Sequence, residues 1–379
     1  METVKLGLLI KKTKVARCGE HSYPVLSITK QDGIIMQSEK FKKRIASADT
    51  SDYKIIPRGK LVQGIHIDEG NFGIQDIVDN GIVSPAYGVW DVNDGLVIPK
   101  YLEMVLRSPK SIEFYRSKLT GTVNRRGHMS DADFLSMDIP LPDRDTQSKI
   151  LKTMKQTTSV LYSRQQQLAK LDELIKARFV EMFGDKNYHY ESLINLILDG
   201  TSLSYGIVQP GNDGTGDMGV LRPVDIVDGK LTMSSIKYID RSIGEGFKKT
   251  ELDGDELLIT VRGTTGITAL TDGRFAGMNV TRGIAVIRYN RKKINPLYLS
   301  AYFNTDESQR YIQEHTRGAT LQQINLSDLR IQRIMLPPLS LQNQFAAFVA
   351  EVDKSKVEVQ KALDQTQLLF DSLMQQYFG

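Results

Sequence analysis

Apolar residues recur at steps of three and four over two long stretches of the 379-residue chain, residues 147–184 and 342–379. Such steps keep the apolar positions along one side of a helix. Neither stretch contains Pro or Gly before its closing Phe-Gly pair. The pattern therefore predicts two uninterrupted helices, each about 55 Å long at the usual rise per residue.

The two stretches share the register of their apolar positions. The predicted seam comprises Ile150, Met154, Leu161, Leu168, Leu171 and Ile175 in the first stretch, and Phe345, Val349, Val352, Val359, Leu363, Phe370 and Leu373 in the second. A helix of this length cannot bury such a stripe by itself, so we expect the two helices to pair as an antiparallel coiled coil. The alternative is that each helix packs only on its own domain.

The second stretch repeats the first at an offset of 195 residues without a gap, from Gln147 and Gln342 to the two Phe-Gly pairs. Repetition is weaker outside the helices, where short β-rich runs are broken by Gly, Asn and Asp, and helices are expected near 99–118 and 296–316. We therefore predict an α+β fold. Its order is a largely β domain (1–146), a helix (147–184), a second such domain (185–341) and a second helix (342–379).

The two predicted domains share a framework of elements but differ in the residues of their surface loops. Residues 63–81 and 259–278 occupy matched positions and show little identity. A common framework with divergent loops is typical of recognition modules. Drift after duplication is the alternative explanation.

Composition restricts the partners and the compartment only mildly. The net charge of +4 and the pI of 8.8 permit a nucleic-acid partner. Cys18 is the one cysteine, which excludes an internal disulfide and indicates a reducing cytoplasm. No apolar run reaches the roughly 18 residues of a membrane span. The five histidines are scattered, so no metal site is predicted.

No motif in the chain predicts a catalytic site. The Gly-rich run from Arg262 to Gly266 lacks the Lys and the spacing of a phosphate-binding loop. Asn295-Pro296-Leu297-Tyr298 is one residue from the Asn-Pro-Pro-aromatic loop of enzymes that methylate DNA bases. Its counterpart in the first repeat, Ile98-Pro99-Lys100-Tyr101, lacks the Asn, and Pro in the first turn of a helix explains both runs. We read Asp253-Gly254-Asp255 as a turn before a strand.

Basic and amide side chains cluster in both domains and are candidates for contacts to phosphates and base edges. The candidates are Lys40, Lys42, Lys43, Arg44, Asn124, Arg125 and Arg126 in the first domain, and Lys248, Lys249, Arg262, Thr264, Thr265, Arg317, Gln322 and Gln323 in the second, where Arg282 adds a further cation. The loops 121–128 and 318–324 are predicted at matching places, just before the final strand of each domain. The alternative is that these loops are merely solvated.

A family resemblance lies in the two segments that lead from a predicted domain into a long helix, which we call the domain exits. Ile139-Pro140-Leu141-Pro142 leads to Gln147, and Met335-Leu336-Pro337-Pro338-Leu339 leads to Gln342; Val83-Ser84-Pro85-Ala86-Tyr87 is also family-like. Over essentially its whole length the chain closely resembles the specificity (S) subunit of type I restriction–modification enzymes. The first exit departs from the second by being one residue longer between Pro142 and Gln147.

The resemblance implies two target-recognition domains, held apart by the helical pair, that bind a bipartite double-stranded DNA site. It implies assembly with two methyltransferase subunits and with restriction (motor) subunits. S-adenosylmethionine, ATP and Mg²⁺ would belong to those partners, and this chain would hold no cofactor and perform no catalysis. The alternatives are a stand-alone sequence-specific DNA-binding regulator and an adenine methyltransferase that uses Asn295–Tyr298.

Overall fold

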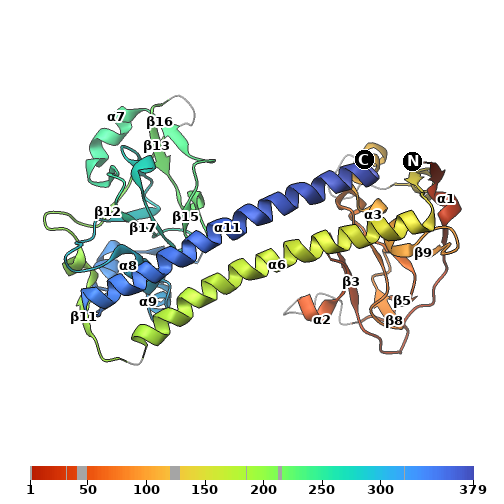
Figure 1. Cartoon of the computed structure of the whole chain (residues 1–379), viewed down its shortest axis with the longest axis horizontal. Helices are drawn as coiled ribbons and strands as arrows, with labels where there is room; N and C mark the ends of the chain where they lie inside the picture. Colours follow the sequence, from red (N-terminus) through yellow and green to blue (C-terminus); the bar gives the residue numbers. More distant parts are fainter. Residues whose placement is uncertain are drawn as a thin grey trace. The chain divides into compact units, whose positions relative to one another are not determined.

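The computed structural model describes residues 2–30, 32–40, 49–119, 129–184, 186–211, 216–319 and 321–379. Two long helices, α6 (Arg144–Phe183) and α11 (Leu339–Phe378), cover the two predicted stretches (Figure 1). The chain divides into two compact units, unit 1 (Met1–Gln165 and Lys361–Gly379) and unit 2 (Gln166–Gln360). Each unit therefore contains one domain and one half of each long helix.

Both long helices begin three residues before the glutamine at which the repeat begins. At α6 the Asp143 carboxylate accepts hydrogen bonds from the backbone N–H and the hydroxyl of Thr146. Such a cap satisfies amide groups of the first turn that have no partner within the helix. The first turn is mostly exposed and carries no apolar periodicity, so the hydrophobic pattern did not include it.

Unit 1 is built on a four-stranded sheet in the order β2-β9-β6-β7. Its strands are β2 (Ile10–Lys12), β9 (Gly88–Val92), β6 (Leu61–Gln63) and β7 (Phe72–Ile74); the pairs β1 (Thr3–Lys5) with β10 (Asp138–Pro140), β3 (Leu26–Thr29) with β4 (Gly33–Met36), and β5 (Lys54–Pro57) with β8 (Asn80–Val83) are antiparallel. The helices of this unit's domain are α1 (Leu6–Leu9), α2 (Gln37–Lys40), α3 (Pro99–Leu106), α4 (Pro109–Lys118) and α5 (Asp131–Leu135). Trp90, Phe72 and Phe134 are fully buried in the core.

Unit 2 repeats this plan with the sheet order β12-β20-β17-β18. Its strands are β12 (Ser204–Tyr205), β20 (Ile284–Ile287), β17 (Leu257–Thr260) and β18 (Thr268–Leu270), and β11 (His189–Ser192) pairs with β23 (Arg333–Leu336) as β1 does with β10. A second sheet contains β16 (Lys237–Ile239), β13 (Met218–Leu221) and β19 (Asn279–Val280), and β14 (Ile226–Val227) pairs with β15 (Lys230–Leu231). Helices α7 (Arg241–Gly244), α8 (Pro296–Phe303), α9 (Asp306–His315) and α10 (Leu326–Ile331) complete the domain. The duplication thus extends to the sheet order, and the helices expected near 99–118 and 296–316 are each a pair, α3–α4 and α8–α9.

The predicted antiparallel pair of long helices is confirmed. In unit 2, the Phe345 ring of α11 lies 5.4 Å from the Phe179 ring and 5.7 Å from the Phe183 ring of α6, and Lys356 forms an ion pair with Asp172. The start of α11 therefore packs against the end of α6. In unit 1, the start of α6 (Ile150, Met154) and the end of α11 (Phe378) share one hydrophobic core.

All the residues of the predicted seam are buried or half-buried. At the helix ends the seam also enters the domain cores. Phe183 packs against Tyr298 of α8 in unit 2, and Phe378 packs against Tyr101 of α3 in unit 1. Each long helix therefore both pairs with the other long helix and packs on a domain.

A buried glutamine fastens each long helix to its domain. Gln147 and Gln342 are both fully buried. The Gln147 side chain accepts a hydrogen bond from the Ile98 amide and donates to the Pro142 carbonyl. Gln342 makes the same two contacts, accepting from the Asn295 amide and donating to the Pro337 carbonyl. The repeated glutamine thus marks one structural connection that occurs twice.

Candidate nucleic-acid interface

The candidate residues of unit 2 lie at opposite ends of the strand pair β17–β20. The register pairs Thr260 with Ile284 at one end and Leu257 with Ile287 at the other. Arg262 follows the first end. Arg288 follows the second end and donates to the Lys249 carbonyl at 2.6 Å. The structure therefore does not bring the eight residues predicted in this domain into one site.

Four segments meet at the Thr260–Ile284 end. They are residues 205–208, 262–266, 281–283 and, apart from residue 320, 316–324, and we call them together the arginine edge. Backbone hydrogen bonds hold them together, from Val261 N–H to the Gly283 carbonyl, from Gly263 N–H to the Gln322 carbonyl and from Arg282 N–H to the Ile207 carbonyl. Arg262, Thr264, Thr265, Arg317, Gln322 and Gln323 all belong to this edge, with Arg282 beside them.

The arginine edge carries only positive charge. Arg262, Arg282 and Arg317 are its charged residues, and none of its segments contains Asp or Glu. Asp328, whose carboxylate lies 3.7 Å from the Arg317 guanidinium, has a largely buried side chain. Uniform positive charge at a loop-built edge attracts the phosphates of a duplex.

The segment 318–324 differs from its prediction. Two strands of two residues each, β21 (Thr316–Arg317) and β22 (Gln323–Ile324), pair with each other in antiparallel fashion. Helix α10 lies in the chain between this pair and the final strand β23. Between the two paired strands, Gly318 adopts a backbone φ of 102°, which strongly favours glycine. Strands of two residues are too short to produce an alternating pattern, so only a loop could be predicted.

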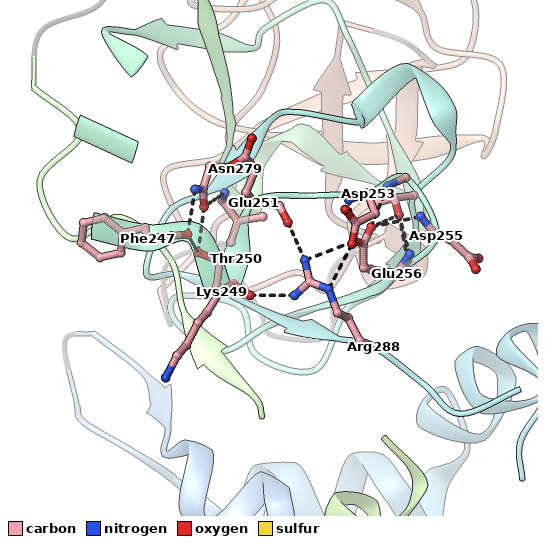
Figure 2. A network of polar contacts seen from close by, with 12 residues as sticks. Phe247, Lys249, Thr250, Glu251, Asp253, Asp255, Glu256, Asn279 and Arg288 are labelled. Atoms are coloured by element: carbon pink, nitrogen blue, oxygen red, sulfur yellow. Dashed lines mark hydrogen bonds and ion pairs between the residues drawn. The ribbon is translucent and has the colours of Figure 1, made fainter. Parts of the chain in front are cut away.

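The opposite end of β17–β20 is an acidic network. Glu256 is buried and accepts hydrogen bonds from the backbone amides of Asp253, Gly254 and Asp255, in the turn that the sequence predicted. Figure 2 shows Arg288 between these carboxylates and the backbone of Lys249 and Glu251. Lys248 and Lys249 line a cavity of about 600 Å³ together with Glu251 and Asp253. The nearby carboxylates make this end a poor site for phosphate, and Arg288 serves the fold.

We expect Arg288→Met to lower the free energy of unfolding by about 2 kcal/mol, because two hydrogen bonds from a charged donor are lost and the buried Glu256 carboxylate loses its cation. Arg282→Met is the matched control. The Arg282 side chain is exposed and has no partner within the described part of the chain, so its loss should change stability by less than about 0.5 kcal/mol. Urea unfolding of the full chain measures both. Equal midpoints would show that Arg288 has no structural role.

In unit 1, Lys42, Lys43, Arg44, Asn124, Arg125 and Arg126 lie outside the described residues, as does the side chain of Lys40. The end that matches the arginine edge is formed where β6 ends and β9 begins, with Gln63 opposite Gly88. Near it lies a basic group that the sequence reasoning did not single out: Lys12, Lys14, Arg17 and Lys54. The Lys54 ammonium donates to the Tyr87 carbonyl, at the end of the family-like segment 83–87.

Electrostatics supports the grouping of these cations. Burial lowers the pKa of the Lys54 ammonium, and the positive charges of Lys12 and Arg17 lower it further. Lys12 and Arg17 form ion pairs with Asp131 and Asp52, whereas Lys14 is exposed. The alternation Lys12-Thr13-Lys14 was a possible signal, but the role of Lys54 depends on a strand pairing that the sequence does not reveal.

The residues that the methyltransferase alternative requires have structural roles instead. The Asn295 side chain caps α8 by accepting from the amides of Leu297 and Tyr298. Tyr298 is fully buried and its hydroxyl donates to the Met335 carbonyl, as that of Tyr101 does to Pro140. Neither side chain is available to hold a flipped base.

The described ranges of the chain contain neither a metal-binding cluster nor a membrane-spanning helix. Within them, no three His, Cys, Asp or Glu side chains lie together as they would to bind a metal ion. No helix in those ranges has the length and apolarity required to cross a membrane.

Several known proteins are similar to this chain in sequence. Residues 215–366 match the family model of the type I restriction modification DNA specificity domain. The Escherichia coli type I restriction enzyme EcoBI specificity subunit is 25% identical over 190 residues, 49% of this chain and 40% of that relative. The putative type I restriction enzyme MjaX specificity subunit of Methanocaldococcus jannaschii is 22% identical over 96% of this chain and 88% of its own length.

Two solved structures share the fold over the whole chain. One comes from work on complex assembly and conformational transition of the type I R-M system (TM-score 0.61, 16% identity, 97% of that chain). The other is the S subunit of a type I system from M. genitalium (TM-score 0.54, 12% identity, 96% of that chain). With its repeated exits, matched sheets and antiparallel helices, the chain is thus similar in sequence and in fold to the DNA specificity subunits of type I restriction–modification systems.

Proposed function

We propose that the chain recognises a bipartite double-stranded DNA site for a type I restriction–modification complex, with one half-site read by each domain. The observation that carries the proposal is a duplicated frame whose two units carry different side chains at the matching edge of the sheet. The sheet order and the buried glutamines recur in both units, whereas the arginine edge has no residue-by-residue copy in unit 1. Two unlike edges on a repeated frame suit two unlike half-sites.

The partners in this proposal are two methyltransferase subunits and restriction (motor) subunits, which would hold S-adenosylmethionine, ATP and Mg²⁺. The matching family model is that of a DNA specificity domain, and the EcoBI relative is described as a specificity subunit of a restriction enzyme. We therefore assign DNA recognition to this chain, in the cytoplasm, and base modification to its partners.

The test is a domain exchange in cells that produce all the subunits. Residues 190–338 are replaced by the corresponding domain of a related specificity subunit, and modified adenines are mapped across the genome. We expect a bipartite motif in which one half changes and the other half is kept. A motif that changes in both halves would contradict the modular reading. Tight sequence-specific binding by the chain alone, without partners, would instead favour a stand-alone regulator.

A second prediction concerns the gap between the half-sites. Insertion of one heptad after Gln165 in α6 and one after Gln360 in α11, where the chain passes between the units, keeps the seam in register. It lengthens each helix by about 10 Å. We expect the gap in the mapped motif to grow by about three base pairs, at 3.4 Å each. A heptad in α6 alone is the control and should destabilise the pair. An unchanged gap after the double insertion would show that the helices do not set it.

A further inference from the structure

Arg262 has a more constrained setting than the other two arginines of the arginine edge. Its backbone continues from β17, and the neighbouring Val261 is held on both sides, by donating to the Gly283 carbonyl and by accepting from the Ile324 amide. Arg282 and Arg317, by contrast, have exposed side chains. Arg262 therefore lies on a well-held part of the edge, between the segment 281–283 and the strand β22.

The Arg262 side chain is also oriented. Its Nε donates a hydrogen bond of 2.7 Å to the side-chain oxygen of Gln323 in β22, and both residues are half-buried. Within the described part of the chain, the two terminal nitrogens of the guanidinium have no partner. One edge of the guanidinium is thus fixed by the protein, and the edge with two parallel donors is left free.

A free, oriented edge of this kind matches one base in particular. The guanine edge in the major groove presents two neighbouring acceptors, O6 and N7, and a bidentate arginine is the commonest specific contact to them. A phosphate contact needs no such fixing, because a charge on a flexible side chain serves it. No carboxylate in the surrounding segments competes for the guanidinium.

We propose that Arg262 reads a guanine in the half-site recognised by unit 2, and that Gln323 is the residue that positions it. The inference rests on the proposed function and makes it more specific: one base pair of that half-site is G·C, and its identity depends on the Arg262–Gln323 pair. Arg282 and Arg317 contact phosphates at the same edge.

The experiment maps modified adenines in cells that produce each full-length variant with its methyltransferase partners. For Arg262→Lys, we expect discrimination at a single G·C pair of one half-site to fall about 10- to 100-fold, the range for loss of one bidentate contact, while the other half-site is unchanged. Arg282→Lys keeps the charge and should preserve the motif. Arg282→Met should lower modification at all sites alike.

Gln323 supplies a pair of variants that separates positioning from stability. Gln323→Leu removes the acceptor for the Arg262 Nε and should relax the same base pair as Arg262→Lys. Gln323→Glu keeps an acceptor at that place and should retain the motif, even with weaker binding from its added negative charge. Thermal unfolding of each purified variant checks that the chain is folded.

Each outcome decides between defined alternatives. A weaker but unaltered motif in Arg262→Lys would make Arg262 a phosphate contact and overturn the inference, as would relaxation of the motif in Gln323→Glu to the same degree as in Gln323→Leu. If the wild-type chain directs no bipartite modification at all, the proposed function itself fails. That failure can be told apart from failure of the Arg262 inference, because it is seen in the wild-type chain and does not depend on any variant.

Discussion

Phe345→Ala is expected to lower the free energy of unfolding of unit 2 by about 3–5 kcal/mol, the usual cost of removing a fully buried aromatic ring. Phe345 is 0% exposed and its ring contacts those of Phe179 and Phe183 on α6 and Tyr298 on α8. The substitution therefore opens a cavity where both long helices and the domain meet. Little backbone rearrangement can fill it, because three rings from two elements, α6 and α8, surround the site.

Leu368→Ala on the same helix is the matched control. Leu368 is 70% exposed, so its truncation removes little buried surface and should change stability by less than about 0.5 kcal/mol. Denaturant unfolding gives the free energies, and hydrogen exchange shows where the chain opens. We expect faster exchange in residues 166–360 of Phe345→Ala. Equal free energies for the two variants would mean that this aromatic cluster does not stabilise the helix pair.

Gln342→Leu is expected to cost about 3 kcal/mol, although leucine is similar in volume and more hydrophobic. The substitution leaves the Asn295 amide and the Pro337 carbonyl without their buried partner. A buried polar group left unpaired costs about 1–3 kcal/mol, and two such groups are affected here. Gln147→Leu should have a similar effect in unit 1, since Ile98 and Pro142 lose the same contacts.

Gln344→Leu supplies the comparison, because Gln344 is exposed two residues along the same helix. Its effect should stay within about 0.5 kcal/mol. Differential scanning calorimetry of the three variants measures the difference directly. If Gln342→Leu unfolds at the same temperature as Gln344→Leu, the glutamine is not the connection that the geometry indicates.

The helices could be predicted from the sequence because their information is local and repeated. A seam at steps of three and four, together with the absence of Pro and Gly, predicts the helix lengths to within one turn and favours their pairing. The repeat also revealed Gln147 and Gln342 as positions of interest, although their role became clear only once the loops before α3 and α8 were placed beside them.

The arginine edge could be predicted only in part, because it depends on strand pairing. Arg262 and Gln323 are 61 residues apart in the chain and meet because the β22 segment joins the end of β17. Lys248 and Lys249 look equally basic in the sequence, yet they lie with the carboxylates at the other end of the same strands. Which end a residue occupies depends on register, and short irregular strands do not encode register in their apolar pattern.

The division of the chain between the two units has a consequence for biosynthesis. Unit 2 is one continuous segment, Gln166–Gln360, so it can fold as soon as that segment has left the ribosome. Unit 1 combines the pairing of Thr3–Lys5 with Asp138–Pro140 and a core that includes Phe378. The part of this core beside Tyr101 can be completed only after the end of the second long helix has been synthesised, because Phe378 packs there. We therefore expect unit 1 to complete its core after unit 2 has folded, although it is synthesised first.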